Sequence, residues 1–201
     1  MKKRNDFCFS FSWLSSLVFL VVISLFSLSW GQKNFAAEDQ AKVQKVLKLI
    51  ERLEKEALEP QPRPWKEVVL TEEELNAYIA YRLRTEQVEM LQDLQIKLLD
   101  NNLIEGKAVF DLSGENLPDF VPRTAVIFFS TVFRVEGGRI YFDFKKIFLG
   151  SQELPVDFVS EMIKQIALAH HAPPEGLNRS YALPFGLKDI KSRKGLAIFY
   201  Y

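Results

Sequence analysis

The feature that most constrains the fold is a pair of alternating apolar segments within residues 126–149, joined by Glu136-Gly137-Gly138-Arg139. Two consecutive glycines accept the positive φ that a two-residue hairpin turn requires at both central positions. At constant register the predicted hairpin places Ile127 opposite Phe148. The end of the hairpin away from the turn, which we call its base, is apolar on both faces. One face collects eight apolar residues: Ile127, Phe129, Phe133, Val135, Ile140, Phe142, Phe144 and Phe148. Because large exposed apolar patches are rare on monomers, we expect this face, and both faces of the base, to be covered.

A second alternating pair occupies residues 91–112. A three-residue loop over Asp100–Asn102, with an asparagine in the left-handed region, keeps one face apolar and pairs Ile96 with Gly106. A two-residue turn would instead mix the two faces. Gly106 and Ala108 leave the apolar face thinly covered, so we expect either a packed helix or a ligand to fill the space above them.

Thr71 marks a well-defined helix start. Thr71 and Glu74 match a capping box, in which each side chain satisfies a backbone N–H of the first turn. Leu70 and Leu75 are placed as the hydrophobic staple that often accompanies it. The helix that begins here carries Ile79 on its apolar face.

Two further helices are predicted. Residues 38–58 have apolar positions at helical spacing over about two heptads, too few for a coiled coil, so this helix is either a solvated stalk or docked on the domain. Three prolines between residues 60 and 64 then form an extended connector. The sequence thus predicts an amphipathic helix with its connector over 36–64 and an α+β domain over 65–201. A later helix carries Ile163 on its apolar side.

The N-terminal segment 1–31 has the layout of an export signal. A basic start over residues 2–4 precedes the apolar stretch Phe7–Trp30, which is longer than the usual signal core and close to the roughly 20 residues that span a membrane. We expect either a signal peptide cleaved after Gly31 or a hydrophobic helix kept as a single-span membrane anchor. The remainder is then exported, periplasmic or otherwise extracytoplasmic, and either membrane-anchored or secreted. The one cysteine, Cys8, lies in the leader, which suits export to an oxidising compartment.

The sequence offers no catalytic or cofactor-binding motif. Lys+Arg and Asp+Glu both total 26, and the zero net charge argues against nucleic-acid binding. G-x-S-x-G, H-E-x-x-H, Walker and G-x-G-x-x-G patterns are all missing. His170 and His171 are adjacent, and helical neighbours point about 100° apart, so they do not share a catalytic or metal centre. We therefore expect no enzyme, no catalytic residue, no cofactor and no metal.

A basic patch near the C-terminus has two readings. It is either a solvated hairpin, turning within residues 193–195, or a contact for anionic lipid headgroups. It comprises Lys188, Lys191, Arg193 and Lys194.

Three short motifs together carry a family resemblance. They are Val69–Tyr78, the pair Gly150 and Leu154-Pro155 after the hairpin, and Leu183–Ile190. Over about residues 65–200 the chain resembles the small bacterial envelope proteins of the LmeA and YpmS kind, which look like reduced relatives of the tubular lipid-binding (BPI-like) domains. The resemblance implies an α+β fold: a strongly curved antiparallel sheet wrapped around a helix, half of a tubular lipid-binding-like domain, with an apolar groove for acyl chains. It implies no catalytic set, and the leader and the first predicted helix lie outside it.

The expected function is therefore non-enzymatic binding of a lipid or another hydrophobic molecule in the cell envelope. Acyl chains would lie between the phenylalanine-rich sheet face and a helix, driven by desolvation. The predicted lining is Ile79, Ile127, Phe129, Phe133, Phe142, Phe144, Phe148 and Ile163. The alternative is an envelope scaffold or assembly factor that binds a protein partner through helix 38–58. Membrane contact is expected through the N-terminal segment.

Overall fold

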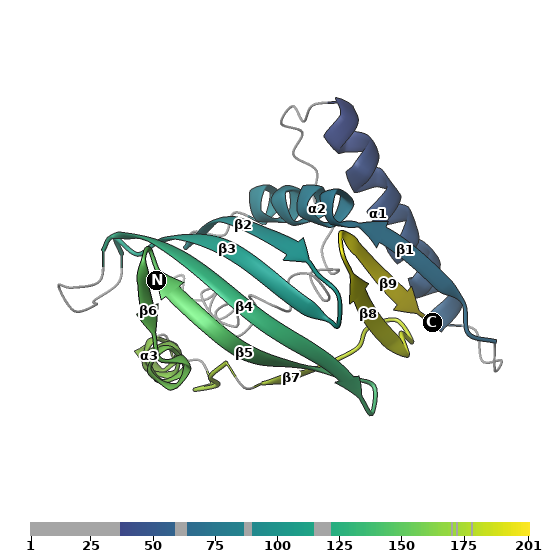
Figure 1. Ribbon diagram of the computed structural model, residues 1–201. Coiled ribbons are helices and arrows are strands. Elements are labelled where there is room, and N and C mark those ends of the chain that lie inside the picture. The colour runs from purple at the N-terminus through teal and green to yellow at the C-terminus, as the bar shows by residue number, and fades with distance from the viewer. Residues whose placement is uncertain are drawn as a thin grey trace, which may run out of the picture.

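In the computed structural model an antiparallel sheet curls strongly into a half-barrel with helices at its edges, so the expected α+β fold with a curved antiparallel sheet is confirmed (Figure 1). The structure describes residues 37–58, 64–86, 90–114, 122–169, 171, 173–177 and 179–201. The leader predicted over 1–31, with its hydrophobic helix, and most of the proline connector lie outside the described residues.

The half-barrel consists of strands in the order β2-β3-β4-β5-β6, each antiparallel to its neighbour. β6 and β7 both pair with the edge of β5 that faces away from β4, at opposite ends of that strand. The bounds are β2 (Leu91–Leu98), β3 (Leu103–Asp111), β4 (Thr124–Glu136), β5 (Arg139–Leu149), β6 (Gln152–Leu154) and β7 (Ser180–Ala182).

A three-stranded antiparallel sheet, in the order β1-β9-β8, accompanies the half-barrel. Its strands are β1 (Glu67–Thr71), β8 (Asp189–Arg193) and β9 (Leu196–Tyr200). The described helices are α1 (Ala37–Ala57), α2 (Glu72–Thr85) and α3 (Val156–Ala169). Because α2 contacts β2 and α3 contacts β5, these two helices lie at opposite edges of the half-barrel (Figure 1).

All three predicted hairpins are confirmed, including the one between β8 and β9 that turns near residues 193–195. Gly137 and Gly138 have φ of 58° and 70° at the tip of the β4–β5 hairpin. Asn101 and Asn102 both have φ of 61°, and Ile96 lies opposite Gly106 as the three-residue loop requires. These conformations are those that glycine and asparagine tolerate better than other residues.

The predicted register of the β4–β5 hairpin is wrong beyond its middle. Thr131 lies opposite Phe144, but the next pair joins Ser130 to Lys146, so β5 contains one extra residue. Such a β-bulge reverses which side chains face inward on the bulged strand. Phe148 therefore lies opposite Phe128 and not opposite Ile127.

The prediction that the base of this hairpin is buried on both faces is wrong. Phe128 is 42% exposed, and its partner Phe148 is only half-buried. The outer face of the half-barrel is therefore partly apolar and turned toward solvent in the part of the chain that the structure describes.

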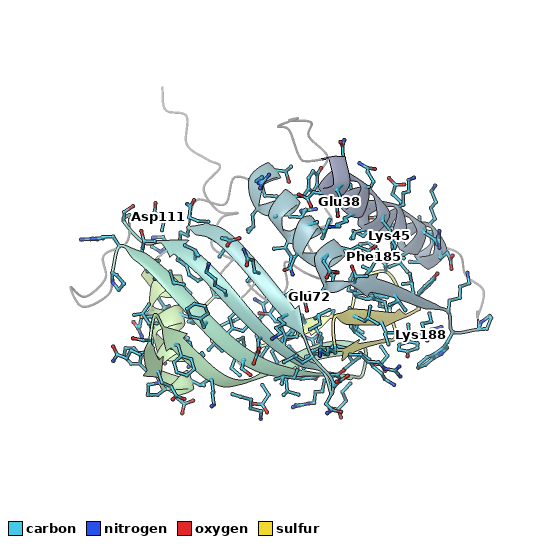
Figure 2. All side chains as sticks on the ribbon, turned by 45° about the horizontal axis from the view of Figure 1, so that its top comes forward. Glu38, Lys45, Glu72, Asp111, Phe185 and Lys188 are labelled. Carbon is cyan, nitrogen blue, oxygen red and sulfur yellow. The ribbon has the colours of Figure 1, made fainter. Side chains whose placement is uncertain are left out.

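Side chains of α2 close the open edge of β2. Asn76 Nδ2 donates to the Ile96 carbonyl (2.7 Å), and the Ile96 N–H donates to Asn76 Oδ1 (2.8 Å). The Leu98 N–H donates to Glu72 Oε2 (2.6 Å), and the Leu98 carbonyl accepts from the Gly195 N–H (2.9 Å). Figure 2 shows Glu72 at this junction of α2 with the sheets. The edge thus has partners other than a neighbouring strand, which protects it from intermolecular pairing.

The helix start at Thr71 is confirmed, and so is the docked alternative for the first helix. Thr71 and Glu74 form both hydrogen bonds of the capping box. The apolar stripe of α1, through Val46, Leu49 and Leu53, belongs to the same hydrophobic cluster as α2. α1 is therefore packed on the domain rather than projecting as a stalk.

Candidate functional site

Seven of the eight predicted site residues lie on the inner face of the half-barrel or on the helices α2 and α3 that pack against it, and four of them are buried. Phe133 and Phe142 lie opposite each other with ring centroids 6.3 Å apart, at 3% and 6% exposure. Together with Ile79 of α2 they belong to the main hydrophobic cluster. Ile163 of α3 belongs to a second cluster, with Ile147 as its partner from β5. The predicted residues thus divide between two clusters.

Three predicted residues join the two clusters. Ile127, Phe129 and Phe144 pack against both the main cluster and the α3 cluster, and each is only half-buried. The Phe129 and Phe144 rings have centroids 5.9 Å apart at an interplanar angle of 58°. We call these three residues the bridging strip. It is apolar and central on the inner face, yet more open to solvent than the clusters on either side.

The eighth predicted residue, Phe148, does not join this strip. The bulge places it opposite Phe128, on the outer face, while Ile147 and Leu149 take the inward positions. The prediction assumed a constant register, and a single extra residue reverses which side chains of β5 face inward beyond it.

The space above Gly106 is filled by neither a helix nor a ligand. A Cβ built on Gly106 would lie 2.1 Å from Cζ of Phe129, so the Phe129 ring lies directly over the glycine. Ala108, the other small residue of this strand, is 1% exposed. Small residues in β3 therefore make room for an aromatic ring from the neighbouring strand.

Thr131 is a polar residue in this apolar row that sequence reasoning missed. It lies between Phe129 and Phe133 on β4, opposite Phe144, and is 1% exposed. Its hydroxyl has no hydrogen-bond partner among the described residues. A buried hydroxyl without a partner costs about 1–3 kcal/mol, so a polar group in this row is exceptional. Its one sequence signal is a threonine at an otherwise apolar alternating position.

Two buried ionisable side chains of the described residues, Tyr181 and Arg82, have shifted pKa values. Burial raises the pKa of Tyr181 to about 12, and its ring meets Phe142 edge-on at 6.3 Å. Burial likewise lowers the pKa of Arg82, which forms an ion pair with Glu86 at the end of α2. Among the described residues no group of three metal-ligating side chains occurs.

Comparison with known proteins found no matching family model, no matching curated protein and no matching solved structure. The resemblance to the LmeA and YpmS kind therefore stays a prediction. Within the described ranges, no helix is long and apolar enough to cross a membrane.

Proposed function

We propose that this protein binds the apolar part of a lipid, or another hydrophobic molecule, on the inner face of the half-barrel. The bridging strip carries the proposal: Ile127, Phe129 and Phe144 are apolar, adjacent and half-buried between two clusters. Covering such a strip removes apolar surface from water, at about 25 cal/mol for each Å². In this view the half-barrel is a reduced counterpart of a tubular lipid-binding domain, with the acyl chain held between the sheet and α3.

Thr131 supports the same location. Its buried hydroxyl lies one inward position from Phe129 and directly opposite Phe144. Hydrophobic binding sites commonly combine an apolar lining with a few polar groups that fix the orientation of the ligand. The proposed chemistry is binding without catalysis, in an exported protein that the N-terminal segment brings to the membrane.

The scaffold alternative has less support. It depended on an apolar stripe along the first helix, and that stripe packs against α2 through Val46, Leu49 and Leu53. A protein partner would have to use the charged side of α1, where Lys45 already binds Glu74 at 2.6 Å. We therefore place the proposed activity in the inner face and not on α1.

The test compares two phenylalanines of the same strand. Phe144 and Phe148 both lie on β5 and are both half-buried, but they face opposite sides of the sheet. The full chain, with a benzophenone amino acid at one position or the other, is expressed in bacteria fed an alkyne-bearing fatty acid and then irradiated. We expect lipid adducts from position 144 and far fewer from position 148.

Two results would contradict the proposal. Equal labelling at both positions would indicate general contact with membrane lipid, and no labelling at position 144 in folded protein would exclude an acyl chain there. Protease added to spheroplasts, which reaches only chain outside the cytoplasm, checks the proposed location in the same cells.

A further inference from the structure

The two most exposed large apolar side chains of the described residues lie at one end of the molecule. Leu58, just after α1, is 85% exposed, and Trp65, just before β1, is 65% exposed. The Lys66–Glu56 ion pair, with Nζ and Oε2 2.7 Å apart, joins the two segments. Figure 1 shows the end of α1, the start of β1 and the C-terminal end of β9 together here. Exposed apolar surface is therefore concentrated at this end of the molecule in the part of the chain that the structure describes.

Lysines lie over the aromatic rings at this end. Lys188 Nζ is 5.6 Å from the centroid of Trp65, and Lys191 Nζ is 5.4 Å from the centroid of Tyr200. The Trp65 and Tyr200 rings are themselves 6.4 Å apart. Figure 2 shows Lys188 at the end of the molecule away from Asp111. The result is a pair of adjacent aromatic rings with a lysine ammonium group over each.

The surroundings of Phe158, an exposed apolar residue on α3, differ from this combination. On α3, Phe158 is 44% exposed, but its nearest charged neighbours in the helix are acidic, Asp157 and Glu161. Tryptophan and tyrosine favour the interface between water and lipid, where one end of the side chain is apolar and the other polar. Lysines beside them reach the phosphates while their alkyl stems stay in contact with apolar groups.

We propose that this end, formed by Leu58, Trp65, Tyr200, Lys188 and Lys191, binds the surface of a phospholipid bilayer that contains anionic lipid. We call it the docking end. Leu58 and Trp65 enter the boundary between headgroups and acyl chains, and the lysines bind lipid phosphates.

Carboxylates at this end limit the electrostatic contribution of the lysines to membrane binding. Glu56 binds Lys66, and Asp189 Oδ2 lies 3.7 Å from Lys191 Nζ. Apolar insertion therefore carries most of the binding, while the lysines set the preference for anionic lipid. The inference stands on the contacts of the docking end and does not depend on a ligand at the bridging strip.

The test follows the fluorescence of Trp65 in the full chain. Trp13 and Trp30 are replaced by phenylalanine, so that Trp65 is the remaining tryptophan. The protein is reconstituted in nanodiscs with brominated acyl chains, made of phosphatidylcholine alone or mixed with phosphatidylglycerol. We expect blue-shifted, quenched emission in the mixed nanodiscs and weaker quenching in phosphatidylcholine. The double variant K188E/K191E is expected to lose roughly half or more of the quenching.

A matched control moves the tryptophan to the opposite edge. In the variant W65F/F158W the reporter lies on α3, and we expect its emission to stay unquenched. Quenching that is equal at positions 65 and 158 would indicate adsorption without orientation and would overturn the proposal. Absence of Trp65 quenching in nanodiscs that contain phosphatidylglycerol would overturn it directly. Quenching of equal strength with and without phosphatidylglycerol, and with and without K188E/K191E, would refute the preference for anionic lipid. Circular dichroism confirms that each variant is folded.

Discussion

At the scale of single residues, the Phe129 ring packs closely over Gly106 on the inner face. A methyl group on Gly106 would lie 2.1, 2.5 and 2.7 Å from three carbons of that ring. Gly106→Ala must therefore displace the ring, and overpacking of this kind costs typically about 1–3 kcal/mol. We expect the free energy of unfolding, measured by chemical denaturation, to fall by that amount.

Two comparisons isolate the cause. Gly114 has no atom within 4 Å of an added Cβ, so Gly114→Ala is expected to change stability little. In a Phe129→Leu background the aromatic ring is gone, and Gly106→Ala is expected to cost much less. An equal loss in both backgrounds would show that the ring is not what the methyl group meets.

The sequence does not predict which of the site residues are fully buried and which are half-buried. Alternation correctly placed Ile127, Phe129 and Phe144 on one face with Phe133 and Phe142. Which of them would be fully buried depends on where α2 and α3 pack along that face, and no local pattern encodes that position. The sequence therefore indicated the face but not the half-open strip within it.

At the scale of elements, local chemistry decided which predictions succeeded. The Gly137-Gly138 turn, the Asn101-Asn102 loop and the capping box at Thr71 all depend on residues adjacent in sequence. The bulge in β5 has no such signature. It falls at Lys145 and Lys146, which are both exposed, so the sequence does not show which of them is the extra residue. β6 and β7 are three residues long, too short to show an alternating pattern, and β7 pairs with the distant start of β5, so the sequence did not reveal them.

Asn76 offers a test of how α2 holds the edge of β2. Its amide both donates to and accepts from the backbone of Ile96, at 2.7 and 2.8 Å. Asn76→Leu leaves both backbone groups without this partner, and we expect a loss of about 1–3 kcal/mol in the free energy of unfolding. Chemical denaturation of the two proteins measures it.

Asn76→Asp separates the donor from the acceptor. An ionised carboxylate accepts from the Ile96 N–H but cannot donate to its carbonyl, whereas a protonated carboxyl does both. The neutral form is thus favoured in the folded state, which raises the folded-state pKa of the introduced carboxyl. The deficit of N76D relative to the unsubstituted chain should therefore shrink as the pH falls through that pKa. A deficit that stays constant with pH would mean that the donated hydrogen bond contributes nothing.

At the scale of the whole molecule, the two clusters differ greatly in size. The main cluster unites α1, α2 and both sheets, whereas the buried part of the α3 cluster is Ile147, Val159 and Ile163. Regions with few buried apolar contacts open at lower free energy than the global unfolding transition. The α3 end is therefore the side on which the inner face is easiest to expose, and the bridging strip lies directly beside it.

We expect Tyr181, which joins β7 to the main cluster, to contribute to the alkaline stability of the whole molecule. Its pKa is raised from 10.0 to about 12 because burial disfavours the phenolate. Because the folded-state pKa is raised, Tyr181 contributes its full stabilisation to the folded state below pH 10. This contribution to the free energy of unfolding is lost as the pH rises toward 12, by roughly 3 kcal/mol in all. Tyr181→Phe keeps the ring contact with Phe142 without an ionisable group. The unsubstituted chain should therefore lose more stability than Y181F between pH 10 and 12, as denaturant titrations at each pH would show. Parallel losses in the two proteins would mean that Tyr181 ionises as readily in the folded state as in the unfolded chain.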